Sequence, residues 1–376
     1  MISNAVFVDS KKHFLILDAL RGVAAIMVVI MHTFELFCKG DYHNLFINHG
    51  YLAVDFFFML SGYVMAHAYD DRWDKMTVVD FCKRRLIRLQ PLIVLGMTFG
   101  ALLFFFQESS IYPKIEDTSI LGLLLVMLIG YTLIPLPPSM DIRGWNEMHP
   151  LNGPGWSLFY EYMANILHVF ILRKLSNLIL SFLVLLAAIA LFYVAITNQS
   201  GDLIGGWSLE PEQLKIGVTR LLFPYMAGML LRRAIKVKRG RKTLLLTSIL
   251  LIGVLSMPRI GTYENVWING LYEALIISIV FPLIIYFGAV GEVKKTYHKK
   301  LCTFLGDISY PLYITHFPFV LIYYAWISNN EISYEHSILV GVLLIFGVIL
   351  IAYASLIMYD LPIRKKLAKR FLYRKK

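Results

Sequence analysis

The chain has 376 residues, of which 58% are hydrophobic and only 16% charged, and its formal net charge is +11. Soluble domains are typically about half apolar and about a quarter charged, so a single soluble core could not bury this much apolar surface. These totals exclude an ordinary soluble domain. They favour an all-α, polytopic integral membrane protein, because helices satisfy their own backbone hydrogen bonds inside a bilayer.

Lysine and arginine gather in short segments between the apolar runs, at 83–88, 232–242, 294–300 and 364–376. This placement is typical of the positive-inside rule, which leaves such segments on the cytoplasmic side. It argues against nucleic-acid binding, the other common meaning of a basic chain. We therefore expect membrane lipids around the protein and no nucleic acid as a partner.

The three cysteines, Cys38, Cys82 and Cys302, are far apart, and the ten histidines form no HExxH motif. We therefore expect neither a disulfide framework nor a metal site.

Ten apolar segments are long enough, or nearly long enough, to cross a bilayer. They lie at 14–37, 50–69, 90–107, 153–172, 175–197, 214–231, 243–257, 267–288, 303–327 and 336–359. The first is too long for the core of a signal peptide and contains Arg21, so we expect it to remain as a membrane helix.

An eleventh apolar stretch, 118–135, is tested by the parity of the crossings. If all four basic segments face the cytoplasm, an even number of spans separates each pair, and counting 118–135 makes the number between Arg85 and Arg239 odd. We interpret 118–135 as a re-entrant or interfacial segment on the external side. The alternative is a misassigned short span elsewhere. The prediction is ten spans in one membrane-embedded domain, 1–376, with both termini cytoplasmic.

The first span carries three ionisable residues, Asp18, Arg21 and His32. Eleven helical residues turn about 1100° and rise about 16 Å, so Arg21 and His32 share a face, and Asp18 lies one turn before Arg21. Ionisable groups inside a membrane span are usually functional. Arginine can hold an anionic group, and imidazole is a suitable general base. The structural alternative is a histidine bonded to a neighbouring helix and an arginine that reaches the interface.

Five segments resemble, in order, those of the acyltransferase-3 family of integral-membrane acyltransferases. They are "LDALRGVAAIMVVIMH" (17–32), "GYLAVDFFFMLSGYVMA" (50–66), "RRLIRLQP" (84–91), "GWSLFYEYM" (155–163) and "LGDISYPLYITHFP" (305–318). Arg21 and His32 fit the family's arginine and histidine in the first helix. The resemblance implies a non-aminoacyl acyltransferase of the O-acetyltransferase kind, in the bacterial inner membrane. It would move an acetyl or other short acyl group from cytoplasmic acyl-coenzyme A to a hydroxyl of a surface glycan, lipid-linked sugar or similar acceptor.

The basic loop after the second span holds Arg84, Arg85 and Arg88. Coenzyme A carries phosphates, and arginine binds phosphate with two parallel hydrogen bonds, so we expect this loop to bind the donor. The alternative is that these arginines only keep the loop on the cytoplasmic side and attract anionic lipid.

Glu161 lies about one turn inside the fourth span. A buried glutamate can act as acid or base or bind acceptor hydroxyls, and the structural alternative is a salt bridge to Arg143 or Arg220. Many relatives have a second acidic residue after this glutamate, and Tyr162 stands there instead. A role that needs a carboxylate pair is therefore in doubt.

Five further residues are expected to support the site. Asp55 should pair with an arginine or orient a histidine, because an unpaired carboxylate in a span is costly. Trp156 and Ser157 precede Glu161, and Tyr313 lies about one turn from His316. His316 is equally consistent with a bond to a facing helix. Arg220 and Glu273 are expected to be pairing residues.

Two other classes of protein remain open. A glycan or lipid transporter or flippase would also carry buried charges, although the chain shows no internal repeat of the kind that transporters often have. An inactive family member that acts as a scaffold is the third possibility.

Overall fold

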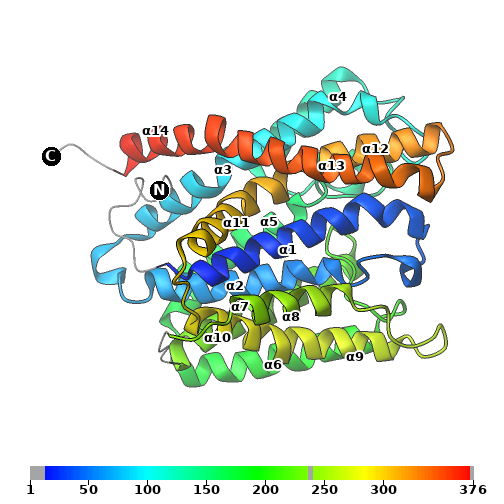
Figure 1. Ribbon diagram of the computed structural model, residues 1–376. Helices are drawn as coiled ribbons and strands as arrows, with labels where there is room; N and C mark the ends of the chain where they lie inside the picture. Colours follow the sequence, from blue (N-terminus) through cyan, green and yellow to red (C-terminus); the bar gives the residue numbers. More distant parts are fainter. Residues whose placement is uncertain (1–12, 236–239, 373–376) are drawn as a thin grey trace.

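The structure is a computed structural model that describes residues 13–235 and 240–372 (Figure 1). The helices are α1 (Leu15–Phe34), α2 (Ala53–Tyr69), α3 (Val78–Leu102), α4 (Ile120–Thr132), α5 (Gly155–Phe170), α6 (Asn177–Thr197), α7 (Pro211–Ala234), α8 (Leu244–Ser256), α9 (Trp267–Leu275), α10 (Phe281–Val290), α11 (Thr296–Thr315), α12 (Phe317–Asn329), α13 (Tyr334–Ala354) and α14 (Leu361–Phe371). The described part of the chain contains no strand, which confirms the all-α prediction. Both termini and the basic residues 236–239 lie outside the described residues.

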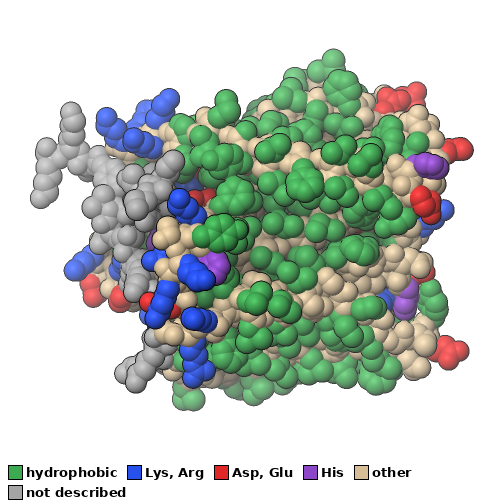
Figure 2. All heavy atoms as spheres, in the orientation of Figure 1, with side chains coloured by type: hydrophobic (Ala, Val, Ile, Leu, Met, Phe, Trp, Pro, Cys, Tyr) green, Lys and Arg blue, Asp and Glu red, His purple; other side chains and the backbone are tan. Residues whose placement is uncertain are grey.

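The surface divides into a wide apolar middle and two polar ends. Figure 2 shows hydrophobic side chains across the middle, most of the visible Lys and Arg at one end together with some Asp and Glu, and mainly Asp and Glu among the charged side chains at the other. We call the first the basic end; α1 and α3 begin there and α14 ends there (Figure 1). The other is the opposite end. This distribution is the one that the positive-inside rule predicts for a bundle that crosses a membrane.

Seven stretches of the described chain are long and apolar enough to cross a membrane. They are Leu15–Cys38, Gly50–Tyr69, Val78–Leu102, Asn177–Thr197, Pro211–Ala234, Trp267–Val290 and Tyr334–Phe371. The predicted count of ten is therefore not confirmed. Of the other three predicted spans, α5 has 16 residues and α8 has 13, and 303–327 is divided at His316 into α11 and α12.

The break at His316 has a local cause. Pro318 stands in the first turn of α12 and has no N–H, so the helix cannot continue its hydrogen bonds through that position. The Ile314 carbonyl, which would accept that bond, instead accepts one from the Asn152 side-chain amide, at 2.7 Å. The joint between α11 and α12 thereby becomes an attachment point for the loop that precedes α5.

The α4 helix enters and leaves the bundle at the opposite end. The segment before it contacts the segment after it, because Lys114 Nζ lies 3.7 Å from Asp141 Oδ2 and the Thr118 hydroxyl donates to the Ile142 carbonyl. Its last turn reaches deeper, where the Tyr131 hydroxyl lies 2.9 Å from the Thr98 hydroxyl of α3. This geometry agrees with the re-entrant interpretation of 118–135.

Two helix pairs that carry site residues pack very closely because glycines stand between them. A Cβ at Gly62 of α2 would overlap the Tyr225 carbonyl of α7, and one at Gly22 of α1 would overlap the Leu305 carbonyl of α11. Without side chains at these points the backbones approach each other directly, as in other membrane helix pairs. The close α1–α11 pair brings Arg21 within reach of α11.

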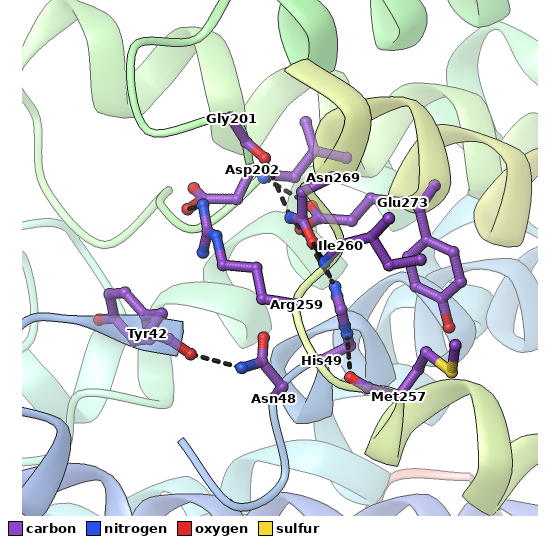
Figure 3. A network of polar contacts seen from close by, with 12 residues as sticks. Tyr42, Asn48, His49, Gly201, Asp202, Met257, Arg259, Ile260, Asn269 and Glu273 are labelled. Atoms are coloured by element: carbon purple, nitrogen blue, oxygen red, sulfur yellow. Dashed lines mark hydrogen bonds and ion pairs between the residues drawn. The ribbon is translucent and has the colours of Figure 1, made fainter. Parts of the chain in front are cut away.

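A buried polar network joins three loops to α9 at the opposite end (Figure 3). Asn269 Nδ2 donates to the Gly201 carbonyl at 3.0 Å and to Glu273 Oε1 at 2.7 Å, and its Oδ1 lies 2.9 Å from His49 Nε2. Arg259 Nη2 pairs with Asp202 at 2.8 Å in the same region. We call His49, Asp202, Arg259, Asn269 and Glu273 the Asn269 network. Glu273 is thus a pairing residue, as the sequence predicted.

Candidate active site

Arg21 is fixed between α1 and α11. Its Nε donates to the Ser309 hydroxyl at 2.7 Å, and its Nη2 donates to the Gly306 carbonyl at 3.0 Å. Asp18 lies 3.7 Å from the same guanidinium, on the preceding turn. His13, which precedes α1, lies 3.7 Å from Asp18, and the interaction with this carboxylate raises the pKa of the His13 imidazole. The guanidinium is therefore oriented by α11 rather than left free to reach the interface.

A cavity of about 150 Å³ opens beside Arg21, between α1, α2, α3, α5 and α11. It is lined by Arg21, Val54, Phe57, Phe58, Leu60, Ser61, Val64, Met65, Arg85, Arg88, Leu89, Ser157, Leu158, Glu161, Ser309, Tyr310 and Tyr313. On α2 the lining runs from Val54 to Met65, which is roughly 16 Å of helix. We call it the donor cavity, for the use proposed below.

The charged groups of the donor cavity belong to three helices, α1, α3 and α5. Among its described lining residues, three are arginines and one, Glu161, is a carboxylate, so positive charge dominates. Arg85 Nη2 pairs with Glu161 Oε1 at 2.6 Å, and the Ser61 hydroxyl donates to the same oxygen at 2.7 Å. Glu161 therefore has Arg85 as its partner, and the suggested bridges to Arg143 or Arg220 are wrong. Arg84 is not among the lining residues, although Arg85 and Arg88 are.

Asp55 has its partner on α7 and faces away from the donor cavity. Arg220 Nη2 pairs with Asp55 Oδ2 at 2.6 Å, and both side chains are fully buried. Arg220 also donates to the Tyr51 carbonyl at 2.7 Å, and its guanidinium lies 5.2 Å from the centre of the Trp156 ring. A buried ion pair with this many partners holds α2, α5 and α7 together, and it explains why Asp55 and Trp156 do not line the cavity.

The far end of the donor cavity is closed by a hydrogen bond between Ser157 and Tyr313, whose oxygens lie 2.7 Å apart. From Tyr313 a series of rings leads toward the opposite end. The centre of the Tyr313 ring is 6.3 Å from that of His316, which is 5.3 Å from that of His32. His32 is therefore not a lining residue of the cavity. His32 and Arg21 lie on the same side of α1, which faces α11 and α12, as the eleven-residue spacing predicted.

Sequence reasoning missed several contributors to this site. Ser61 stands inside the quoted segment of residues 50–66 but had no role, and its hydroxyl contacts Glu161. Ser309, which binds Arg21, stands inside a quoted motif but had no role. No spacing along the chain could have found these two, because each contacts a helix that is distant in the sequence. The described residues contain no group of side chains that could hold a metal ion.

Seven stretches long and apolar enough to cross a membrane, together with an internal cavity lined by three arginines, define the chain as a polytopic helical membrane protein. The profile of a family described as "Acyltransferase domain" matches residues 14–357. The chain therefore belongs to this acyltransferase family, and the prediction made from its motifs is confirmed.

Two relatives match along most of the chain. "O-acetyltransferase OatA" of Staphylococcus aureus is 26% identical over 381 residues, which cover 95% of this chain and 58% of the relative. "Peptidoglycan O-acetyltransferase OatA" of Listeria monocytogenes is 24% identical over 377 residues, or 95% of this chain and 56% of the relative. The chain thus spans little more than half the length of these two proteins.

A third relative matches over a shorter region. "Protein 2 in picA locus" of Rhizobium radiobacter is 34% identical over 161 residues, which cover 41% of this chain and 80% of the relative. No solved structure matches the chain.

Proposed function

We propose that the protein is an O-acyltransferase of the bacterial inner membrane that takes an acetyl or other short acyl group from acyl-coenzyme A. The basic end would face the cytoplasm and receive the donor. The acceptor would be a hydroxyl of a surface glycan, a lipid-linked sugar or a similar molecule. The names of the two OatA relatives support O-acetylation as the reaction class. The observation that carries the proposal is the donor cavity, with its arginines toward the basic end.

The chemistry of the cavity matches the two parts of the donor. Arg21, Arg85 and Arg88 supply guanidinium groups, which bind phosphate strongly in a site shielded from water. Beyond them, Val54, Phe57 and other apolar side chains line a passage that suits the uncharged arm bearing the thioester. Glu161 moderates the positive charge and orients Arg85. Asp18 does the same for Arg21.

The transfer step requires a base. The acceptor oxygen attacks the thioester carbonyl, a C–O bond forms, the C–S bond breaks, and coenzyme A leaves as a thiol after taking up a proton. His32 can accept the hydroxyl proton for direct transfer, which typically contributes about 10²–10⁴-fold. Alternatively, His32 carries the acyl group itself in two steps. In both schemes Tyr313 and His316 lie between the cavity and His32, so the thioester must reach beyond the Ser157–Tyr313 bond.

Purified protein incubated with radiolabelled acetyl-coenzyme A and a membrane extract tests the proposal. Label should pass into glycan or lipid, and His32→Ala should abolish this transfer while the protein remains folded in the membrane. A single turnover without extract separates the two mechanisms, because label trapped on His32 indicates the acyl-histidine route and its absence indicates direct transfer.

The same preparation, reconstituted in vesicles, tests the alternative functions. Movement of glycan or lipid across the vesicle membrane without label transfer would contradict the proposal and indicate a transporter or flippase. Normal transfer by His32→Ala would contradict the catalytic role of His32. A cellular phenotype that persists unchanged in that variant would indicate a scaffold.

A further inference from the structure

A second group of buried polar side chains lies beyond the donor cavity, around the start of α12. Five buried atoms there have no hydrogen-bond partner among the described residues. They are His32 Nδ1, Arg143 Nη2, Glu147 Oε2, Asn152 Oδ1 and His316 Nε2. A buried polar group without a partner costs about 1–3 kcal/mol. Five of them in one region therefore indicate that a polar molecule completes their hydrogen bonds.

These side chains come from separate elements and meet at Phe317. The centre of the His32 ring lies 5.0 Å from that of Phe317. A Cβ at Gly153 would lie 2.9 Å from Glu147 Oε1 and 2.9 Å from Phe317 Cε1, so the bare glycine separates Glu147 from the same ring. His32 and Glu147 thus approach Phe317 from α1 and from the loop before α5.

The loop before α5 is fastened to the α11–α12 joint at two points. Arg143 Nη1 donates to Gln107 Oε1 at 2.7 Å, and Gln107 Nε2 donates to the Pro318 carbonyl at 2.9 Å. Asn152 donates to the Ile314 carbonyl, as described above. The positions of Arg143 and Asn152 are therefore set by the break between the two helices, next to His316.

The unpaired atoms include both hydrogen-bond donors and acceptors. His316 Nδ1 lies 2.9 Å from the Leu312 carbonyl and so carries the proton, which leaves Nε2 as an acceptor. Arg143 Nη2 can only donate, and Asn152 Oδ1 can only accept. Burial raises the pKa of Glu147 to about 8, so near neutral pH its carboxyl group is protonated and can both donate and accept. A sugar hydroxyl, which also does both, suits this mixture.

We propose that Arg143, Glu147, Asn152 and His316, which we call the acceptor cluster, bind the hydroxyls of a neutral sugar and hold one of them against His32. This inference rests on the acyltransferase function proposed above and assigns the acceptor end of that reaction. It places the two substrates on opposite sides of Tyr313: the donor enters from the basic end, and the sugar binds at the opposite end. Glu147 is a positioning residue, because it acts on the hydroxyl through binding and takes no part in the bond changes.

The test compares Glu147→Leu, which removes the hydrogen-bonding groups of this side chain, with Glu116→Leu, which removes an exposed carboxylate at the same end. The acceptor probe is the glycan fraction of the membrane extract. Glu147→Leu should raise the apparent KM for this fraction at least 10-fold and leave the KM for acetyl-coenzyme A within twofold of the wild type. Glu116→Leu should leave both constants unchanged. Glu147→Gln, whose amide donates and accepts like the protonated carboxyl group, should keep an acceptor KM close to that of the wild type, and a 10-fold rise in this variant would contradict the role of a protonated Glu147.

Several outcomes would overturn the inference. An unchanged acceptor KM in Glu147→Leu would mean that buried water, rather than the sugar, serves these atoms. An equal rise in the donor KM would mean that Glu147 acts on the whole bundle. If the wild type transfers no label, the proposed function fails by itself, and a thermal shift with the glycan fraction of the membrane extract then decides the inference. The glycan fraction should raise the melting temperature of the wild type and not that of Glu147→Leu; equal shifts would contradict a sugar site.

Discussion

Buried arginines serve two different purposes in this bundle, and their partners decide which. Arg220 pairs with Asp55 and also donates hydrogen bonds to backbone carbonyls, so its charge is compensated within the protein. Arg88 lines the donor cavity, but no ion pair joins it to a carboxylate among the described residues, whereas Arg21 and Arg85 have Asp18 and Glu161 as partners. Charge that is not neutralised within the protein is available to a ligand. Arginines of the second kind are therefore the ones expected to bind the donor.

Replacing Arg88 tests this distinction directly. Arg88→Gln should raise the KM for acetyl-coenzyme A by roughly 10-fold or more, because a hydrogen bond to a charged group is worth about 1.5–3 kcal/mol. The maximal rate should change much less, since the phosphates are remote from the reacting carbonyl. Steady-state kinetics on purified protein provides the measurement.

Lys83→Gln is the matched control for Arg88→Gln. It removes one positive charge from the same helix, outside the cavity lining, and should leave the donor KM unchanged. If both variants raise the KM equally, the basic segment acts only through its general field, and specific phosphate binding by Arg88 is contradicted.

Single residues show where sequence reasoning succeeds and where it ends. The need for a partner of Asp55 is predictable, because a carboxylate in a span must be compensated. Its identity, Arg220, is not, since 165 positions separate the two and only the packing of α2 on α7 brings them together. The same limit explains why Arg85 was not expected as the partner of Glu161. The shared face of Arg21 and His32 was predictable, because it depends on one helix alone.

Among the elements, α4 and the segment that follows it decide on which side of the membrane the loop before α5 lies. Their contacts bring the chain before α4 next to the chain after it, as the re-entrant interpretation requires. If the basic end is cytoplasmic, residue 145, which lies in the following loop and is exposed, must be reachable from outside the cell. The parity argument from sequence and the hydrogen bonds of the loop therefore lead to the same prediction.

Cysteine labelling measures this topology. Trp145→Cys should react with a membrane-impermeant maleimide in right-side-out vesicles. Ser139→Cys, an exposed position nearby, should behave in the same way without the loss of a tryptophan. Native Cys82 is exposed at the start of α3, near the basic end, and should react only in inside-out vesicles. Cys38 and Cys302 are buried and should react in neither.

The reverse pattern, with position 145 labelled only in inside-out vesicles and Cys82 only in right-side-out vesicles, would overturn the orientation proposed here. Labelling of position 145 and Cys82 from the same side would also mean that an odd number of crossings had been misassigned between them.

At the scale of the element, length was the least predictable property. Hydropathy located the apolar segments well, but the 303–327 segment became two helices. Pro318 gave a local signal for that break. For α5 the sequence gave no comparable signal, because Ile171 and Leu172 continue the apolar run past its end. For α8, Pro258 marks the end of the helix two residues after Ser256.

Across the whole molecule, the two ends of the bundle differ in how they are held together. The donor cavity opens among helices toward the basic end, whereas the opposite end is tied together by side chains from its loops. The Asn269 network links the loop before α2, the loop after α6 and the loop before α9 (Figure 3). A bundle fixed at one end can admit a donor at the other without losing its helix packing.

This arrangement predicts that stability and donor binding can be separated. Asn269→Leu should lower the melting temperature of the purified protein, because it leaves His49 Nε2 and the Gly201 carbonyl buried without this partner and leaves Glu273 Oε1 with the Tyr51 hydroxyl alone. Each such loss costs about 1–3 kcal/mol. The dissociation constant for acetyl-coenzyme A, measured well below the melting temperature, should stay within twofold of the wild-type value. Leu250→Asn makes the opposite change, from an apolar to a polar side chain, at an exposed position of α8. It is the control for a change of polarity alone. A large loss of donor affinity in Asn269→Leu, with an unchanged melting temperature, would show that the opposite end shapes the cavity directly and that the two ends are not independent.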